Sequence, residues 1–293
     1  MNFEGTYVAM ITPFDNKGDI DEEGFRSNIN YLIDKGVNGL VGAGTTGESA
    51  TITHDEHKQI IEVLVDEVDG RVETIAGTGS NSTSEALNLT KFAQDIGVDA
   101  ALVITPYYNK PQQHALVNHY RAVGTCDIPV IAYNVPSRTG VDIAPSTYAA
   151  LADHPMIGAI KEASGNISQI AKVAELCGDK MDIYSGNDDQ IVPVLSLGGK
   201  GVISVLSNLV PKETSDMCHL FWEGKTKESL ELQLKYLSLV DALFSEVNPI
   251  PAKAAMAAMG YCENALRLPL TPMESKNEEK LLAIMRKVGI LEG

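Results

Sequence analysis

The sequence lacks the features of membrane and secreted proteins. No apolar run among its 293 residues approaches the roughly 20 that a membrane-spanning helix needs. The first ten residues, MNFEGTYVAM, contain no basic region followed by a long apolar stretch, so no secretory signal is expected. Cysteine is scarce, and Cys126, Cys177, Cys218 and Cys262 form no CxxC pair. We therefore expect a cytoplasmic protein with reduced thiols, and neither a disulfide framework nor a metal held by cysteines.

Positive charge is also in short supply. There are 23 Lys and Arg against 39 Asp and Glu, which gives a formal net charge of −16. Such a surface repels phosphate backbones, so nucleic acid is not an expected partner. The remaining composition, 44% hydrophobic and 21% charged, is typical of globular proteins with a sizeable core. A solvated acidic surface is the main interpretation of the charge, and a salt-rich cytoplasm is the alternative.

Short β-rich runs alternate with amphipathic stretches along most of the chain. Several of the runs are apolar without alternation, as in strands buried on both faces of a parallel sheet. Between them, residues 21–36 and 82–97 place apolar side chains at helical spacing and end in glycine, which predicts helices. The expected strands are residues 6–14, 39–44, 73–79, 100–106, 129–136, 157–163, 182–188 and 201–208.

Eight strand–helix units in about 200 residues predict an α/β protein with a closed (β/α)8 TIM barrel. The alternative, an open doubly wound sheet, would normally have a glycine-rich phosphate loop after its first strand, and ITPFDNKGD is not one. After about residue 210 only helical patterns remain, and no low-complexity linker precedes them. We expect the barrel and its catalytic site in residues 1–223 and a C-terminal helical region in residues 224–293.

A lysine stands where the pattern predicts a dry strand end. Lys161 lies in AIKEASGN, at the end of the sixth expected strand. In a parallel barrel, functional residues gather at the carboxyl ends of the strands. Burial disfavours an ammonium ion and lowers the lysine pKa from its usual value of about 10.4. A neutral amine can condense with a carbonyl to form a Schiff base. The structural alternative is a lysine that reaches water or pairs with Glu162.

Other unusual residues follow neighbouring strands. In GTTGES, Gly44 and Gly47 would let the backbone expose N–H groups to an anion, and Thr45 and Thr46 add hydroxyls; a plain turn with a helix cap is the alternative. Tyr133 could simply fill the barrel, although a buried hydroxyl requires a partner. In the loop after the same strand, Arg138 is either a surface charge or a clamp for a substrate carboxylate.

These segments together resemble the dihydrodipicolinate synthase family, within the pyruvate-dependent class I aldolase group that includes N-acetylneuraminate lyase. The resemblance extends over nearly the whole chain, in matching order and spacing. It runs from VAMITPF through GTTGESAT, IAGTGSNST, TPYYNKP, YNVPSRTG, IKEASGN, GGKGVISV and NPIPAK to LRLPLTP.

The resemblance implies a condensation of pyruvate with L-aspartate 4-semialdehyde to 4-hydroxy-tetrahydrodipicolinate, in lysine and diaminopimelate biosynthesis. Lys161 would form the Schiff base, and no metal or other cofactor is implied. Tyr133, Thr45 and Tyr108 would form a proton relay, with Tyr108 supplied by the neighbouring subunit. Thr46 would hold the pyruvate carboxylate and Arg138 that of the second substrate. Gly186 and Ile203 would line the pocket.

The resemblance also implies regulation and assembly. His54 and His57 are a poor zinc motif, because no HExxH pattern and no cysteine pair accompany them; two exposed histidines are the plain alternative. In lysine-inhibited members of the family, matching positions bind L-lysine at a subunit interface. These are Ala50, His54, His57, Gly79, Asn81, Glu85 and Tyr107. We therefore expect feedback inhibition by L-lysine and at least a homodimer, commonly a dimer of dimers.

Three alternative functions are weighed at this point. One is an aldolase for 2-keto-3-deoxy sugar acids or a sialate lyase, which usually lacks an arginine at the position of Arg138. The second is a non-catalytic protein that binds a keto acid, which has no need of a nucleophile with a proton relay. The third is a phosphate-binding barrel of another family, which requires a glycine-rich phosphate-binding loop after strands seven and eight. LGGKGVIS matches such a loop only faintly.

Overall fold

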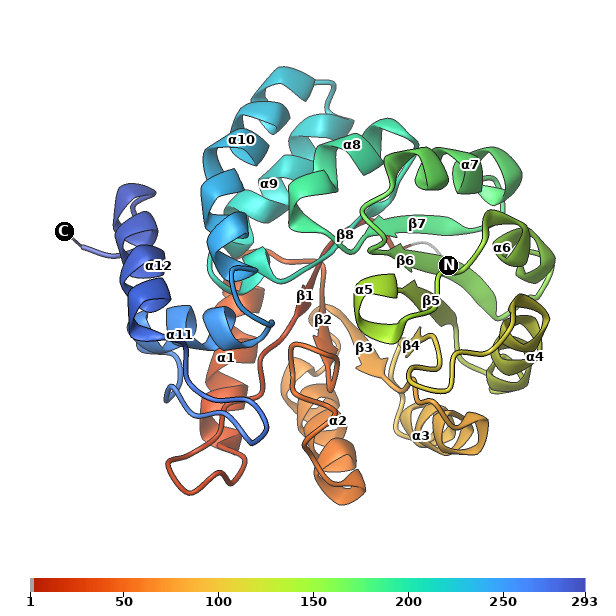
Figure 1. The fold of residues 1–293 in the computed structure, drawn as a ribbon, viewed down its shortest axis with the longest axis horizontal. Coiled ribbons are helices and arrows are strands. Elements are labelled where there is room, and N and C mark those ends of the chain that lie inside the picture. The colour runs from red at the N-terminus through yellow and green to blue at the C-terminus, as the bar shows by residue number, and fades with distance from the viewer. Residues whose placement is uncertain (1–2, 293) are drawn as a thin grey trace.

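The computed structural model describes residues 3–292, which form a closed barrel of eight parallel strands in chain order (Figure 1). Each strand pairs with its neighbours in sequence, and β1 closes the barrel against β8. The (β/α)8 barrel expected from the sequence is confirmed. The strands are β1 (Gly5–Ala9), β2 (Gly39–Gly42), β3 (Glu73–Gly77), β4 (Ala100–Ile104), β5 (Val130–Asn134), β6 (Ile157–Glu162), β7 (Asp182–Ser185) and β8 (Gly201–Ser204).

Helices surround the strands and bury their apolar faces against them (Figure 1). The predicted helix over residues 21–36 is α1, capped by the Asp21 side chain, and Gly36 follows its end with a φ of +81°. The ring consists of α1 (Glu22–Asp34), α2 (His54–Val68), α3 (Thr83–Asp95), α4 (Gln113–Val123), α6 (Pro145–Leu151), α7 (Ile167–Cys177), α8 (Ile191–Ser196) and α9 (Pro211–Trp222). Shorter turns are α5 (Pro136–Thr139), η1 (Asp188–Gln190) and η2 (Leu206–Asn208).

The observed strands begin within a residue of the expected positions but end earlier. The first apolar run was expected to continue to residue 14, whereas β1 ends at Ala9. Met10 and Ile11 nevertheless stay buried, because they pack under the helices after leaving the sheet. The apolar pattern therefore marks burial, and the residues beyond each strand form the loops at one end of the barrel.

The C-terminal region adds α10 (Thr226–Leu243), α11 (Ile250–Ala258) and α12 (Ser275–Lys287) at one side of the barrel (Figure 1). Its side chains share a hydrophobic core with the barrel: Tyr236 and Leu239 belong to the same buried cluster as Val202 of β8. The boundary between residues 223 and 224 remains a prediction. None of the helices in residues 3–292 is sufficiently long and apolar to pass through a bilayer.

Candidate active site

Lys161 and Tyr133 lie side by side on neighbouring strands. The two residues are in register between β5 and β6, and the Lys161 Nζ lies 4.4 Å from the centroid of the Tyr133 ring. Lys161 is only 5% exposed. Because the ammonium loses its hydration there, burial lowers the lysine pKa to about 8, with Arg138 acting in the same direction and Asp188 opposing it. The neutral amine is therefore more readily formed here than at a solvated lysine.

Glu162 does not pair with Lys161. Successive residues of a strand point to opposite faces, and Glu162 faces away from the barrel interior. Its carboxylate accepts hydrogen bonds from the Asn134 amide at 3.1 Å and 3.2 Å and from the Tyr148 hydroxyl at 3.3 Å. The Ser164 N–H donates to it at 2.8 Å. The Glu162 carboxylate is therefore engaged in hydrogen bonds outside the barrel interior, away from Lys161.

Tyr133 is buried, and Thr45 lies near its hydroxyl. Burial raises the Tyr133 pKa to about 12, while Arg138 and Thr45 oppose this rise. The tyrosine is therefore protonated at neutral pH and can donate a proton through its hydroxyl. The structure brings Lys161, Tyr133 and Thr45 together at one end of the barrel, as the sequence predicts.

The glycines of the loop after β2 do not supply its left-handed backbone conformations. Its left-handed residues are Ala43 (φ 53°) and Glu48 (φ 57°), and neither Gly44 nor Gly47 adopts a positive φ. Gly47 is needed for another reason. A Cβ there would lie 3.0 Å from the Thr12 hydroxyl oxygen and 3.3 Å from the Met10 carbonyl. The glycine allows close packing of the loop against the residues that follow β1, and the exposure of N–H groups to an anion stays a prediction.

Asn248, which sequence reasoning missed, contacts two of the predicted site residues. Thr46 is buried and its hydroxyl accepts a hydrogen bond from the Asn248 side-chain amide at 3.0 Å. Arg138, in α5, donates to the Asn248 carbonyl at 2.9 Å. The NPIP sequence around Asn248 predicts a helix start, with proline in the first turn of α11, but nothing in it indicates contacts with residues so distant in the chain.

Gly186 lies beside the lysine, and Ile203 lies in the barrel interior. A Cβ at Gly186 would lie 3.2 Å from Lys161 Cε and 2.7 Å from the Ala163 Cβ, so glycine leaves room for the lysine side chain. Ile203 is 1% exposed and packs inside the barrel in the same cluster as Tyr133. Asp188, also missed as a site residue, is buried nearby and accepts hydrogen bonds from the Val205 and Leu206 N–H groups at 3.0 Å and 2.9 Å.

Tyr108 stands apart from this group within one chain. Its side chain is 90% exposed, and its φ of +73° is unusual for a bulky residue. Tyr107, next to it, is 38% exposed. A strained, outward-facing tyrosine pair after β4 is consistent with a contact outside the single chain.

The residues expected to bind lysine gather around the start of α2 and α3. His54 Nε2 lies 2.7 Å from a Glu85 carboxylate oxygen, and the Ser80 hydroxyl donates to the other oxygen at 2.5 Å. His54 and Glu85 both line a cavity of about 550 Å³. His57 is instead buried, its Nε2 lies 2.7 Å from the Gly77 carbonyl, and burial lowers its pKa. The remaining positions are Ala50, which is exposed, with Gly79, Asn81 and Tyr107 on the loops after β3 and β4.

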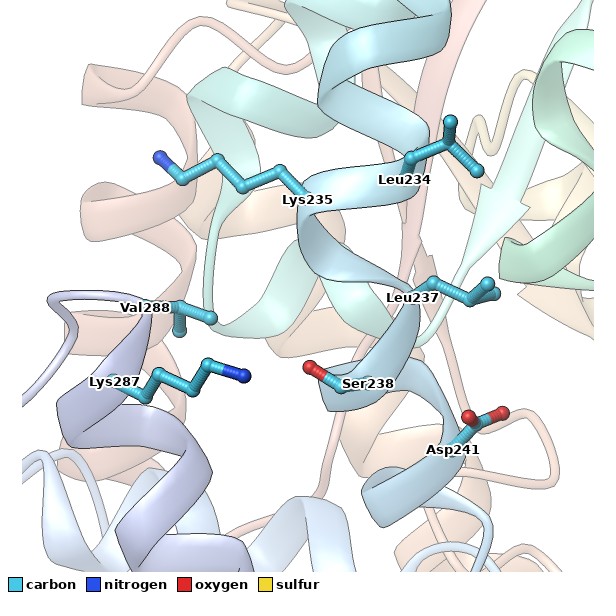
Figure 2. A pocket seen from close by; sticks show the side chains of 7 residues that line it. All are labelled: Leu234, Lys235, Leu237, Ser238, Asp241, Lys287 and Val288. Carbon is cyan, nitrogen blue, oxygen red and sulfur yellow. The ribbon is translucent and has the colours of Figure 1, made fainter.

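A second groove, of about 470 Å³, lies between α10 and α12 (Figure 2). Figure 2 shows the Lys287 side chain extending toward Ser238. None of the residues that line it is on a strand or on a loop that follows one. This groove therefore lies outside the candidate active site. In residues 3–292 no group of three or more His, Cys, Asp or Glu is arranged to hold a metal ion.

The fold and this site together are those of a barrel enzyme that can capture a carbonyl compound through a lysine amine. The model of the Dihydrodipicolinate synthetase family matches residues 2–288. The 4-hydroxy-tetrahydrodipicolinate synthase of Geotalea uraniireducens is 47% identical over 290 residues, which cover 99% of this chain and all of that one. The chain belongs to the dihydrodipicolinate synthase family, as the sequence resemblance predicts.

Solved structures agree with this assignment. The dihydrodipicolinate synthase of Thermotoga maritima superposes with a TM-score of 0.97 at 41% identity, covering 99% of this chain and 100% of that one. A lysine-bound enzyme of the same name from Cyanidioschyzon merolae has a TM-score of 0.96 at 39% identity, with 99% of both chains covered.

Proposed function

We propose that this protein condenses pyruvate with L-aspartate 4-semialdehyde to give 4-hydroxy-tetrahydrodipicolinate, in the biosynthesis of diaminopimelate and lysine. The observation that carries the proposal is the buried Lys161 amine, with a pKa lowered to about 8, beside the Tyr133 ring. The family membership supports the choice of reaction.

The reaction begins with attack of the neutral Lys161 amine on the keto carbon of pyruvate. Tyr133 and Thr45 transfer protons so that the carbinolamine oxygen leaves as water and a protonated imine forms. The imine withdraws electrons, so loss of a methyl proton gives an enamine. The enamine carbon then attacks the aldehyde of the second substrate, whose oxygen takes up a proton. The amino group of that substrate adds to the imine, closes the ring and releases Lys161.

Orientation is supplied by the polar residues around the lysine. Thr46 and neighbouring backbone N–H groups bind the pyruvate carboxylate, and Arg138 binds the carboxylate of L-aspartate 4-semialdehyde. Gly186 and Ile203 shape the pocket beside Lys161. A guanidinium at this position favours an acidic aldehyde over a sugar chain, which weighs against the sialate-lyase alternative.

Borohydride trapping tests nucleophile and substrate together. With pyruvate and borohydride, the peptide containing Lys161 should gain the mass of a reduced pyruvate adduct. Only the neutral amine attacks, so the trapping rate at subsaturating pyruvate should rise as the pH passes upward through about 8. The sample without pyruvate is the control. A protein that turns over while Lys161 stays unmodified would refute the proposal.

The active unit is, on this proposal, a cytoplasmic homodimer or a dimer of dimers. A partner subunit would cover the exposed Tyr107 and Tyr108 and place Tyr108 in the relay with Tyr133 and Thr45. The 90% exposure of Tyr108 and its positive φ support this interpretation. Neither nucleic acid nor membrane is part of the proposed assembly.

L-Lysine should inhibit the enzyme at the cavity lined by His54 and Glu85. The ammonium of lysine would replace His54 as the partner of the Glu85 carboxylate, while Asn81 would bind the lysine carboxylate; the lysine-bound relative supports this site. Glu85→Gln should weaken inhibition by about 10-fold or more, because it removes a charged hydrogen-bond acceptor. Initial rates against lysine concentration measure this. Glu62→Gln, an exposed change on α2, is the matched control. Saturating lysine that leaves the wild-type rate unchanged contradicts the prediction.

A further inference from the structure

One residue outside the barrel touches both sides of the candidate active site. Asn248 lies between α10 and α11 and is 5% exposed. Its side-chain amide donates to the Thr46 hydroxyl at 3.0 Å, across 202 positions of sequence. Its backbone carbonyl accepts from the Arg138 guanidinium at 2.9 Å, across 110 positions. The residue therefore joins the loop after β2 to the turn after β5.

The segment that carries Asn248 is held firmly against the barrel. Lys253, one turn into α11, is completely buried, and its Nζ lies 2.6 Å from a Glu48 carboxylate oxygen. Lys253 N–H also donates to the Pro249 carbonyl at 2.8 Å. Since Glu48 is two residues from Thr46, the ion pair fixes the same loop that the Asn248 amide contacts. The Asn248–Thr46 hydrogen bond and the Lys253–Glu48 ion pair therefore both fix the position of the amide relative to Thr46.

The direction of the hydrogen bond decides what Thr46 can do. A threonine hydroxyl has a single proton to donate. Because the Asn248 amide donates to the Thr46 oxygen, that proton is not used toward Asn248 and is available for an anion. The Asn248 Oδ1 is buried, and among residues 3–292 it has no hydrogen-bond partner. An amide oxygen that is buried without a partner costs folding free energy, so stability alone does not account for this asparagine. A role in the site does.

We propose that Asn248 is a positioning residue for pyruvate: its side chain orients Thr46 as a donor to the substrate carboxylate, while its carbonyl steadies Arg138. This inference rests on the proposed function. The two roles use different atoms, so they can be separated by mutation. Removing the side chain takes away only the contact with Thr46, because the backbone carbonyl that Arg138 contacts remains.

Asn248→Ala should raise KM for pyruvate about 10-fold, the effect of a hydrogen bond to a charged group, with KM for L-aspartate 4-semialdehyde changed less than about twofold. Asn248→Asp keeps the shape but offers Thr46 a carboxylate acceptor, so it should raise KM for pyruvate at least as much. Adding Asn248→Ala to Thr46→Val should produce little further change, since the two residues act through one bond. Val247→Ala, at the exposed preceding residue, is the matched control and should leave both constants unchanged.

The measurements are steady-state kinetics with each substrate varied, thermal melting, and borohydride trapping with pyruvate. Trapping of pyruvate at Lys161 in the wild-type protein tests the proposed function by itself. A failure of the Asn248 prediction can therefore be told apart from a failure of the proposed function. An unchanged KM for pyruvate in both Asn248 variants overturns the inference. So does an equal change in both KM values accompanied by a lower melting temperature, because that pattern indicates only a structural role. Should Asn248→Ala fail to fold, the isosteric Asn248→Asp decides.

Discussion

Lys161→Met should reduce turnover by at least about 10³-fold and abolish the reducible adduct with pyruvate, because it removes the nucleophile and leaves the rest of the site in place. Methionine has nearly the same length as lysine and no charge, so it can occupy the dry position beside Tyr133. The expected phenotype is a folded protein without covalent chemistry. Initial rates and mass mapping of the peptide containing residue 161 measure it.

The stability of Lys161→Met shows whether its loss of activity comes from missing chemistry or from unfolding. Folding lowers the Lys161 pKa from 10.5 to about 8, so the unfolded chain binds more protons between these values. By linkage, this lysine reduces stability below pH 8, and the penalty disappears as the pH rises from about 8 to 10.5. Lys161→Met should therefore be at least as stable as the wild type at pH 7. Lys172→Met, at an exposed position on α7, should change neither activity nor stability. Appreciable turnover by Lys161→Met would contradict the assignment.

Lys253→Met should lower the free energy of unfolding by about 3–5 kcal/mol, the usual cost of removing one partner from a buried ion pair. Both Lys253 and Glu48 have completely buried side chains, and the lysine Nζ also donates to the Ala265 carbonyl at 2.6 Å. Without the lysine, Glu48 must be buried as an uncompensated charge or take up a proton. Urea denaturation at pH 7 measures the loss.

The double variant Glu48→Gln/Lys253→Met should recover much of that stability, because replacing both charges removes the uncompensated one. Lys287→Met, on the exposed surface of α12, is the matched control and should stay within about 0.5 kcal/mol of the wild type. If Lys253→Met is no less stable than Lys287→Met, the buried pair does not contribute as described.

The sequence predicts the barrel and the placement of Lys161 and Tyr133 well because both depend on local patterns. Apolar runs of strand length alternate with helical periodicity, and this order defines the fold. The burial of Lys161 follows from its neighbours in β6, and the position of Tyr133 follows from the adjacent strand. The ends of the strands are less predictable, since residues such as Ile11 leave the sheet but remain in the core.

The contacts that join the two ends of the chain are not visible in local patterns. α11 lies within the helical region expected over residues 224–293, but its buried ion pair was not expected, although Lys253 within the otherwise apolar sequence IPAKAAMAA is a signal that could have identified a buried charge. Its partner Glu48 lies more than 200 residues earlier, and neither local sequence contains a feature that identifies the other as its partner. The role of Gly47 in packing against Thr12 and Met10 was also not visible in the sequence, because these contacts join separate loops.

The link between the loop after β2 and α11 has a consequence for synthesis of the protein on the ribosome. Residues 45–48 are among the first sixth of the chain to emerge, yet their partners Asn248, Lys253 and Arg267 appear only near the end of translation. A nascent chain that already contains all eight strands still lacks the groups that hold this loop. Catalytic competence should therefore be acquired late, after residue 267 has left the exit tunnel, and the incomplete polypeptide should be inert toward its substrates.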